Sequence, residues 1–378
     1  MSGTVTFDGA PPPGTINLGI GQPSASLLPV SLLREASDSF YSDAQPLELN
    51  YGVPEGDERF LGSLAGYLTE GYGAPASPDS LFVTAGNSQA LDLISTVFSE
   101  AGDTVFVEEP SYYLAFKIFR DHGLNVVGVP IDAEGMRIDA LEELLHEHSP
   151  AFVYTIPSYH NPAGCCLTSE RRTRLIELSQ EHGFFIVADE VYQLLNYFDE
   201  PPPAFGTMTE SSTVLSLGSF SKILAPGLRL GWIQTSPELR QRLTTNGFVN
   251  SGGSISHYSS HIVRYAIDLG LQDAHLADLR RTYRSRVEVM HDALQQQIGD
   301  LATWRPPDGG YFFWLRFRRD VDTASLRERA RDLQTGFQPG AAFSNDGSLC
   351  NSLRLSFAHY NEDDIREGIA RLTPLFAR

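Results

Sequence analysis

The chain has 378 residues, of which 42% are hydrophobic and 20% are charged, an ordinary balance for a globular protein. Its 28 basic and 47 acidic residues give a net charge of −19, which argues against binding to nucleic acid or to an anionic membrane surface. A chain of this length usually folds into more than one domain. The metal-ligand spacings CxxC and HExxH do not occur in the sequence, so we expect no metal site.

The N-terminal sequence MSGTVTFDGAPPPG has neither a basic region nor an apolar core, so we expect no signal peptide. Residues 1–15 are polar and rich in proline and glycine, and they are predicted to form an N-terminal arm. The three cysteines, Cys165, Cys166 and Cys350, are too few for a disulfide framework and favour a reducing compartment. No apolar run reaches the roughly 18 residues of a membrane-spanning helix. These features predict a cytoplasmic protein.

From about residue 80 the sequence alternates short apolar segments with amphipathic ones. The predicted strands cover 81–85, 104–109, 125–131, 151–156, 184–190, 213–219 and 229–235. The predicted helices cover 88–100, 112–123, 141–148 and 171–183. Apolar strands separated by amphipathic helices are typical of a mainly parallel sheet with helices on both faces. The pattern therefore predicts an α/β fold.

After about residue 255 the pattern changes. A long helical region to about residue 299 precedes a strand at 309–318, a helix near 323–334, a strand at 352–358 and a last helix. This order indicates a smaller α+β domain. We expect the N-terminal arm to be followed by a large domain at 46–265, with the small domain built from 16–45 and 266–378.

Polar motifs lie at or directly after the carboxyl ends of five of the predicted strands. They are TAGNSQA from residue 84, EEPSYY from 108, PSYHNPAG from 157, DEVY from 189 and SFSK from 219. Ligands of open α/β sheets collect at the carboxyl ends of the strands. We therefore expect the five motifs to converge on one crevice.

Lys222 lies among small hydroxyl residues in the run SLGSFSKILAPGLRLGW. A buried lysine can have a depressed pKa, which makes a neutral amine available as a nucleophile for a carbonyl. Hydroxyl groups, a guanidinium and the free N–H groups of a helix start suit a phosphate. The residues that offer these groups are Asn87, Ser88, Gln89, Ser219, Ser221 and Arg229. An amine beside a phosphate site predicts a phosphorylated aldehyde held as a Schiff base, for which pyridoxal 5'-phosphate is the biological candidate.

Other polar residues of the predicted crevice match the remainder of that aldehyde. Asp189 follows an apolar strand and offers a carboxylate that keeps a pyridine nitrogen protonated, which makes the ring an electron sink. Asn161 and Tyr192 offer hydrogen bonds to the phenolic oxygen of the ring. Tyr112 offers an aromatic face for stacking on it.

Taken together, the sequence motifs of the chain resemble those of a known family. The motifs that carry the resemblance are INLGIGQP, NYGVPEG, TAGNSQALDLI, EEPSYY, YHNPAG, ADEVY, SFSKILAPGLRLGW, GGYFFW and LRLSF. In order and spacing they resemble fold-type I pyridoxal-phosphate enzymes of the class I/II aminotransferase family. Within this family, the motifs are similar to those of the 2-aminoadipate and multisubstrate aminotransferases and of the aminotransferase-like domains of MocR regulators. The resemblance implies a mainly parallel sheet of the seven-stranded type, sandwiched by helices, plus a smaller α+β domain.

The resemblance also implies a role for each matching residue. Lys222 forms the Schiff base and then acts as general base, with Asp189 and Tyr192 as further catalytic residues. The implied cofactor-binding residues are Asn87, Ser88, Gln89, Tyr112, Asn161, Asp189, Tyr192, Ser219, Ser221, Lys222, Arg229 and Tyr51. Tyr51 is implied to reach the cofactor phosphate across the interface of a homodimer, the commonest symmetric assembly.

The implied substrates are an L-amino acid and a 2-oxo acid. Arg354 matches the arginine that binds the substrate α-carboxylate, and Gly21 and Asn161 are implied to lie beside the substrate. Leu27, Leu28 and Pro29 are candidates to line the substrate pocket, which would suit an apolar or aromatic side chain. The sequence leaves the identity of the amino acid open.

Two alternatives to an aminotransferase remain open. The first is a lyase, decarboxylase, cyclase or oxidase of a biosynthetic pathway on the same fold, although Arg354 favours reactions that leave the carboxylate intact. The second is the effector-sensing half of a transcription regulator. That class carries a basic DNA-binding domain ahead of the aminotransferase-like part, whereas here about 15 residues precede INLGIGQP and the net charge is −19.

Overall fold

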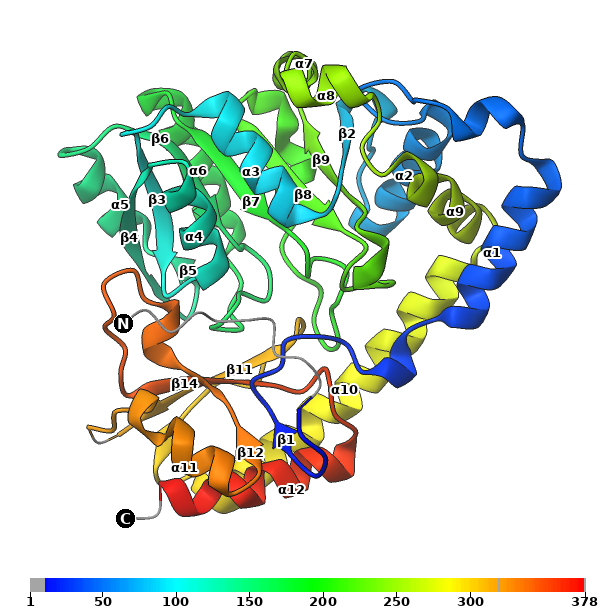
Figure 1. The fold of residues 1–378 in the computed structure, drawn as a ribbon. Helices are drawn as coiled ribbons and strands as arrows, with labels where there is room; N and C mark the ends of the chain where they lie inside the picture. Colours follow the sequence, from blue (N-terminus) through cyan, green and yellow to red (C-terminus); the bar gives the residue numbers. More distant parts are fainter. Residues whose placement is uncertain (1–10, 319, 377–378) are drawn as a thin grey trace.

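The computed structural model describes residues 11–318 and 320–376. Most of the predicted N-terminal arm, residues 1–10, therefore lies outside the described residues. The described chain contains one eight-stranded sheet and one four-stranded sheet, each packed against helices (Figure 1). The large sheet is built from the middle of the chain, and the small one from its C-terminal part.

The strands of the large sheet are ordered 2-9-8-7-6-3-4-5. Their bounds in that order are β2 (Leu81–Thr84), β9 (Gly231–Thr235), β8 (Val214–Ser219), β7 (Phe185–Asp189), β6 (Pro150–Thr155), β3 (Thr104–Glu109), β4 (Asn125–Asp132) and β5 (Gly135–Met136). Strand β9 pairs antiparallel with β2 and β8, and the two-residue β5 pairs antiparallel with β4. The other four pairs are parallel, which confirms the predicted mainly parallel sheet.

Helices cover both faces of this sheet, as the apolar strands predict. Along β3, Val105 and Val107 pack into one hydrophobic cluster and Phe106 packs into another, because successive side chains point to opposite faces. The first cluster includes residues of α2 (Glu58–Tyr72), α3 (Asn87–Phe98) and α4 (Tyr113–Asp121). The second includes residues of α5 (Ile138–Leu145) and α6 (Ser169–His182). The central strands are therefore shielded from water on both faces.

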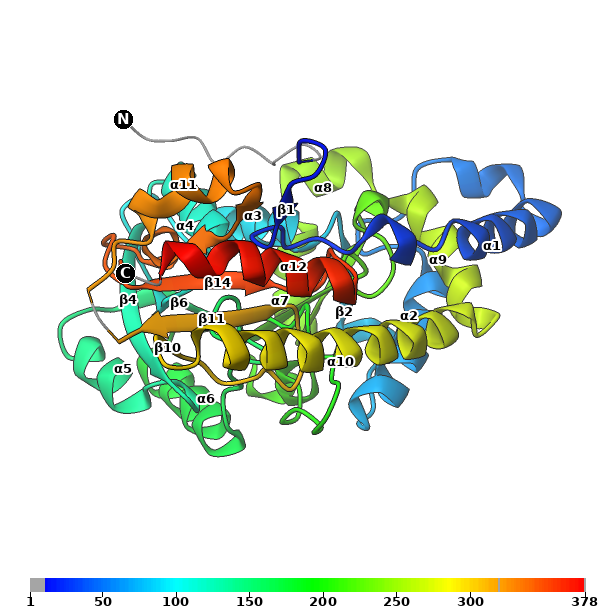
Figure 2. The same cartoon turned by 90° about the horizontal axis from the view of Figure 1, so that it is seen from below.

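The small sheet is antiparallel, in the order 10-11-14-13. Its strands are β10 (Ala302–Thr303), β11 (Phe312–Phe317), β14 (Ser352–Ser356) and β13 (Gln338–Pro339). Two helices, α10 (Leu271–Ile298) and α12 (Glu362–Leu372), lie side by side along it (Figure 2). Near them, β1 (Ile16–Asn17) pairs in parallel with β12 (Thr335–Gly336), which joins the beginning of the described chain to its end.

Two predicted helices differ from those observed. The long helical region is divided at Gly270, whose φ of +69° ends α9 (His257–Asp268) and permits α10 to begin in a new direction. The helix predicted near 323–334 is shorter, because only α11 (Arg327–Asp332) is α-helical there. The sequence pattern located both regions but not these boundaries.

Helix α1 (Val30–Asp43) packs along α9, at one end of the molecule (Figure 1). Phe40 of α1 stacks on His261 of α9, with ring centroids 5.4 Å apart and an interplanar angle of 9°. Two shorter helices, α7 (Pro237–Thr244) and α8 (Gly247–Gly252), precede α9. In the described part of the chain no helix is long and apolar enough to cross a membrane.

Candidate active site

A cavity of about 690 Å³ lies where the carboxyl ends of the large-sheet strands face the small sheet. All five strand-end motifs contribute to its lining. The predicted site residues that line it are Gly21, Asn87, Ser88, Tyr112, Asn161, Asp189, Tyr192, Ser219, Ser221, Lys222, Arg229 and Arg354. Among the lining residues, three are basic and one is a carboxylate, so the cavity as a whole favours an anionic ligand.

Lys222 follows β8 and points its amine into the cavity. Its Nζ donates a hydrogen bond to the carbonyl oxygen of Gly21 at 3.0 Å, and it lies 5.3 Å from the centroid of the Tyr311 ring. Burial, together with the nearby positive charge of Arg354, lowers the pKa of Lys222 to about 8. A neutral amine is consequently much more abundant at physiological pH than for a solvated lysine.

Asp189 ends β7 and is buried beneath the cavity. Its Oδ1 accepts a hydrogen bond from Asn87 Nδ2 at 2.5 Å, and its Oδ2 accepts one from the hydroxyl of Tyr154 at 2.9 Å. Burial raises the pKa of Asp189, whereas these two donors and the charge of Lys222 act in the opposite direction. The carboxylate is thus held by donors on both of its oxygens.

One end of the cavity gathers hydroxyl, guanidinium and backbone N–H groups. Ser219 Oγ donates to Ser221 Oγ at 2.9 Å, and Arg229 Nη1 lies 3.4 Å from Ser221 Oγ. Helix α3 begins next to them, with its N-terminal N–H groups and positive dipole end at the cavity. A Cβ on Gly86, which precedes α3, would lie 2.9 Å from Arg229 Nη2, so only glycine leaves this guanidinium in place.

Arg354, on β14 of the small sheet, also lines the cavity. Its side chain is 4% exposed, and its guanidinium carbon lies 4.0 Å from the centroid of the Phe312 ring and 4.9 Å from that of Phe343. Its Nη1 donates to Asn161 Oδ1 and its Nη2 donates to the carbonyl of Gly19, both at 2.9 Å. In the described residues Arg354 forms no ion pair, so its charge is available to an anionic ligand.

Aromatic residues also line the cavity. Tyr192 is buried, with its ring 5.4 Å from that of Tyr311 and 6.0 Å from that of Phe312. Burial raises the pKa of both Tyr192 and Tyr112, so both phenols keep their protons. Tyr112 lies immediately before α4 and faces the same space.

Some predicted residues lie elsewhere. Gln89 does not line the cavity; its Oε1 instead accepts a hydrogen bond from the backbone N–H of Ala85 at 3.1 Å. Tyr51 is 84% exposed and is also absent from the lining of this cavity. The segment 27–29, a candidate for the substrate pocket, does not reach the cavity either, whereas residues 19–23 do.

The structure adds residues that sequence reasoning missed. Tyr154 lies inside the apolar segment AFVYTI, where a tyrosine is expected to pack in the core, and only the neighbouring strand reveals its contact with Asp189. Glu190, next to Asp189, forms a buried ion pair with Arg172 of α6 at 3.4 Å. Gly19 and Phe312 also hold Arg354, although neither residue type signals that role.

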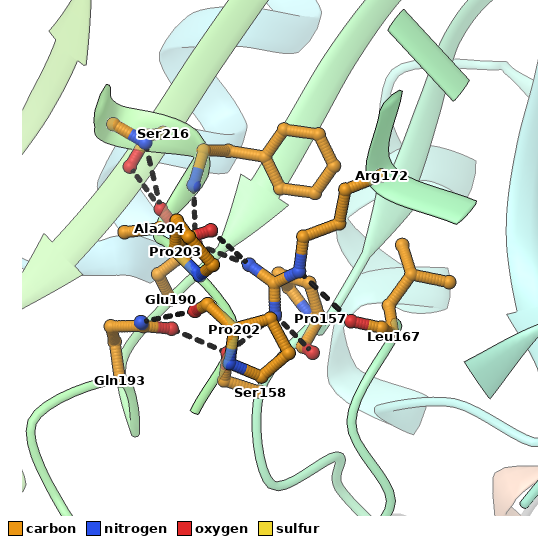
Figure 3. A network of polar contacts seen from close by, with 12 residues as sticks. Pro157, Ser158, Leu167, Arg172, Glu190, Gln193, Pro202, Pro203, Ala204 and Ser216 are labelled. Carbon is orange, nitrogen blue, oxygen red and sulfur yellow. Dashed lines mark hydrogen bonds and ion pairs between the residues drawn. The ribbon is translucent and has the colours of Figure 1, made fainter. Parts of the chain in front are cut away.

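The Arg172–Glu190 pair joins several loops (Figure 3), and neither residue lines the cavity. Arg172 Nη2 donates to the carbonyl of Pro157 at 2.7 Å, and its Nη1 donates to the carbonyl of Pro203 at 3.0 Å. Glu190 Oε1 accepts from the Phe205 N–H at 2.8 Å. This network fixes the chain directly after Asp189, at Glu190, and before Asn161, at Pro157.

The cavity matches pyridoxal 5'-phosphate group by group. The amine of Lys222 would suit its aldehyde, the carboxylate of Asp189 would suit its ring nitrogen, and the α3 start with Arg229 would suit its phosphate. The amide oxygen Oδ1 of Asn87 is buried and has no hydrogen-bond partner among the described residues. No group of three or more metal-ligating side chains occurs in the described part of the chain.

Comparison with known proteins identifies the same family as the sequence motifs. Residues 13–372 match the family Aminotransferase class I and II. The aromatic-amino-acid aminotransferase 1 of Thermococcus litoralis is 35% identical over 363 residues, which cover 94% of this chain and 87% of the relative. An HTH-type transcriptional regulator of Bacillus subtilis is 30% identical over 356 residues, which cover 94% of this chain and 72% of the regulator.

Solved structures agree in fold. The multiple substrate aminotransferase of Thermococcus profundus superposes with a TM-score of 0.90 at 32% identity, covering 96% of this chain and 91% of the other. The α-aminoadipate aminotransferase of Thermus thermophilus, complexed with N-(5'-phosphopyridoxyl)-L-leucine, superposes with a TM-score of 0.87 at 30% identity, covering 97% and 92%. The chain therefore belongs to the class I and II aminotransferases, fold-type I enzymes that use pyridoxal 5'-phosphate to transfer an amino group between an amino acid and a 2-oxo acid.

Proposed function

We propose that this aminotransferase acts on amino acids with uncharged, preferably aromatic, side chains. The observation that carries the proposal is the composition of the cavity lining outside the residues predicted to bind the cofactor or the α-carboxylate. None of these further lining residues is charged. Their larger side chains are those of Ile20, Gln22, Leu91, Tyr113, Leu114, Ile156, Val191, Phe312 and Gln338.

A dicarboxylic substrate needs a cation for each carboxylate. Arg354 is the cation suited to the α-carboxylate, whereas Arg229 lies at the hydroxyl-rich end beside Ser221. No further basic residue lines the cavity of the described chain for a second carboxylate. The name of the Thermococcus litoralis relative, an aromatic-amino-acid aminotransferase, supports the same substrate class.

In the proposed site, each residue has a distinct task. Arg354 binds the substrate carboxylate with a planar fork that Phe312 and Asn161 hold in place. Asp189 and Tyr192 hold the ring of the cofactor, which supplies an electron sink when it is bound. Residues at the α3 start, with Ser219, Ser221 and Arg229, bind the phosphate.

Lys222 is the proposed general base. With a pKa of about 8, roughly a tenth of its amine is neutral at pH 7, so it accepts a proton from the substrate α-carbon and afterwards returns one. The carbonyl of Gly21 holds the amine at the cavity surface. Since Arg354 fixes the carboxylate and leaves it intact, the bond to the α-hydrogen is the one that reacts.

An amino-donor panel tests the proposal. Purified protein loaded with pyridoxal 5'-phosphate is mixed with phenylalanine, tyrosine, leucine, aspartate, glutamate or 2-aminoadipate, and the absorbance of the bound cofactor is followed. We expect conversion to the pyridoxamine form to be fastest with the aromatic donors. Faster conversion with the dicarboxylic donors would contradict the substrate class. Release of ammonia or hydrogen peroxide without that conversion would contradict amino-group transfer itself.

We also propose that the enzyme is a homodimer. Several large apolar side chains of residues 30–53 are exposed, including Val30, Leu47 and Leu49 at 68%, 79% and 61%. Exposed apolar surface of this extent marks interaction sites. Burial of this segment against a second copy would also give Tyr51 a partner cavity to enter. Sedimentation equilibrium distinguishes a dimer from a monomer.

Two further expectations remain proposals. A cytoplasmic location fits the free state of all three cysteines. The proposed division into a large domain (46–265) and a small domain (16–45 and 266–378) is supported by the pairing of β1 with β12, which ties the N-terminal segment to the small sheet region.

A further inference from the structure

Tyr154 lies in the interior of the protein, next to the cavity but not part of its lining. It belongs to β6 and has no exposed surface. Its ring packs edge-on against Phe119 of α4, with centroids 5.5 Å apart and an interplanar angle of 71°. A tyrosine in such a position usually finds a partner for its hydroxyl.

That partner is Asp189 of the adjacent strand. Strands β6 and β7 run parallel, with Tyr154 in register with Val187 and Thr155 with Ala188. Asp189 lies two residues beyond Val187, so its side chain points to the same face of the sheet as Val187. The phenol of Tyr154 therefore reaches Oδ2 of Asp189, at 2.9 Å.

Asn87 completes the arrangement from the opposite side. It is the first residue of α3, and its side-chain amide donates to Oδ1 of Asp189. The two oxygens of the carboxylate are thus held by donors from two different elements, and the carboxylate cannot rotate without breaking one of these bonds. Asn87 lines the cavity and Tyr154 does not, so Tyr154 acts only through Asp189.

We propose that Tyr154 is a positioning residue, whose hydroxyl keeps the carboxylate of Asp189 ionised and oriented toward the ring nitrogen of the cofactor. This inference rests on the proposed role of Asp189. A hydrogen bond to the charged form of a carboxyl group favours that form. Because burial raises the pKa of Asp189, the loss of one donor has a direct effect on its ionisation.

The charges of other titratable groups affect the pKa values of Asp189 and Tyr154. Burial raises the pKa of Tyr154, and the charge of Asp189 raises it further, so the phenol keeps its proton. The groups whose charges act on Asp189 or Tyr154 are Lys222, Tyr112, Tyr192 and Glu108. Because none of them changes in a Tyr154→Phe variant, that variant isolates the phenol hydroxyl.

The test measures the dissociation constant of pyridoxal 5'-phosphate from the refolded apoenzyme. The variants are Tyr154→Phe, Asp189→Asn, the double variant, and Tyr197→Phe as a matched control. Tyr197 is also buried, but its hydroxyl donates to the backbone carbonyl of Gly310 at 2.6 Å, away from the cavity. The pH titration of the absorbance of the bound cofactor is recorded for each variant.

We expect Tyr154→Phe to raise the dissociation constant about tenfold, the loss that a hydrogen bond to a charged group produces. It should also shift the pH at which the absorbance of the bound cofactor changes. The control Tyr197→Phe should leave this pH and the dissociation constant unchanged. In the Asp189→Asn background the same substitution changes the constant less than about twofold, because coupled residues are not additive. Tyr154→His, which keeps a ring N–H donor, restores part of the affinity and serves as the second variant if the phenylalanine form does not fold.

Unchanged cofactor binding in Tyr154→Phe overturns the inference. An equal loss of cofactor affinity in the wild-type and Asp189→Asn backgrounds also overturns it, because that result would show a purely structural role of Tyr154. Failure of the wild-type protein to bind the cofactor contradicts the proposed site as a whole, so the two failures are distinguishable.

Discussion

The guanidinium of Arg354, on the small sheet, donates to the amide oxygen of Asn161, in the loop after β6 of the large sheet, at 2.9 Å. This bond links the small sheet to a loop of the large sheet, and both residues line the cavity. Phe312 and Phe343 flank the same guanidinium, so its plane is fixed before any ligand arrives. The cavity is therefore organised for a carboxylate in the absence of substrate.

Replacement of Arg354 by lysine tests this organisation. Lysine keeps the charge but loses the planar fork that binds a carboxylate with two parallel hydrogen bonds. We expect the KM for the amino donor to rise about 10- to 100-fold, while cofactor affinity stays unchanged. Steady-state kinetics provides the measurement, and Arg366→Lys, at an exposed ion pair with Asp363, is the control. A KM equal to that of the wild type would contradict the assignment.

The pKa of Lys222 predicts a pH dependence of cofactor capture. Only the neutral amine reacts with an aldehyde, and the folded protein lowers the pKa of Lys222 to about 8. The rate of capture by the apoenzyme should rise about tenfold per pH unit below pH 8 and level off above it. Stopped-flow absorbance between about pH 6.5 and 9.5 measures this profile, a range that brackets the lowered pKa. A rate that still rises steeply at the upper end would indicate a lysine with an ordinary pKa.

A side chain at Gly21 would crowd Phe312 beside Arg354. A Cβ at this position would lie 3.1 Å from Cζ of Phe312 and 3.5 Å from Nη2 of Arg354. Overpacking of this kind costs about 1–3 kcal/mol, so Gly21→Ala should raise the KM for the amino donor by at least several-fold. Gly62→Ala is the matched control, because a Cβ there meets no atom within 4 Å. Equal kinetics in the two variants would refute a tight approach of substrate at Gly21.

The buried ion pair of Arg172 and Glu190 contributes to the free energy of unfolding. Removing Arg172 leaves the carboxylate of Glu190 buried without its cation, which costs about 3–5 kcal/mol. Arg172→Met should therefore unfold at a markedly lower urea concentration than the wild type. In contrast, Arg174→Met removes a half-exposed pair with Glu142 and should cost less than about 1 kcal/mol. A small and equal effect of both substitutions would contradict this difference.

Much of the site could be predicted from the sequence, since each functional motif directly follows an apolar strand. Parallel strands place their carboxyl ends at one edge, which is why residues as distant in the chain as Ser88 and Ser221 line the same cavity. Lys222 and Asp189 could be located for the same reason without structural information. The local sequence pattern was sufficient for these two residues, because their reactive side chains lie at the carboxyl ends of strands.

Other features depend on contacts that local sequence does not encode. Nothing in the segment AFVYTI indicates which strand lies beside Tyr154 or what its hydroxyl meets. The side-chain amide of Asn87, which we predict to bind the phosphate, donates to Asp189, and the local sequence does not indicate this contact between α3 and β7. The antiparallel direction of β9 follows from sheet pairing, not from the apolar composition of its residues.

The most direct test of a Schiff base at Lys222 is borohydride reduction of the protein loaded with pyridoxal 5'-phosphate, followed by peptide mass spectrometry. The chain contains two lysines, Lys222 in the cavity and Lys117, whose side chain is 69% exposed. We predict one phosphopyridoxyl group per chain, on the peptide that contains Lys222. Labelling confined to Lys117, or an unmodified protein, would contradict a Schiff base at Lys222.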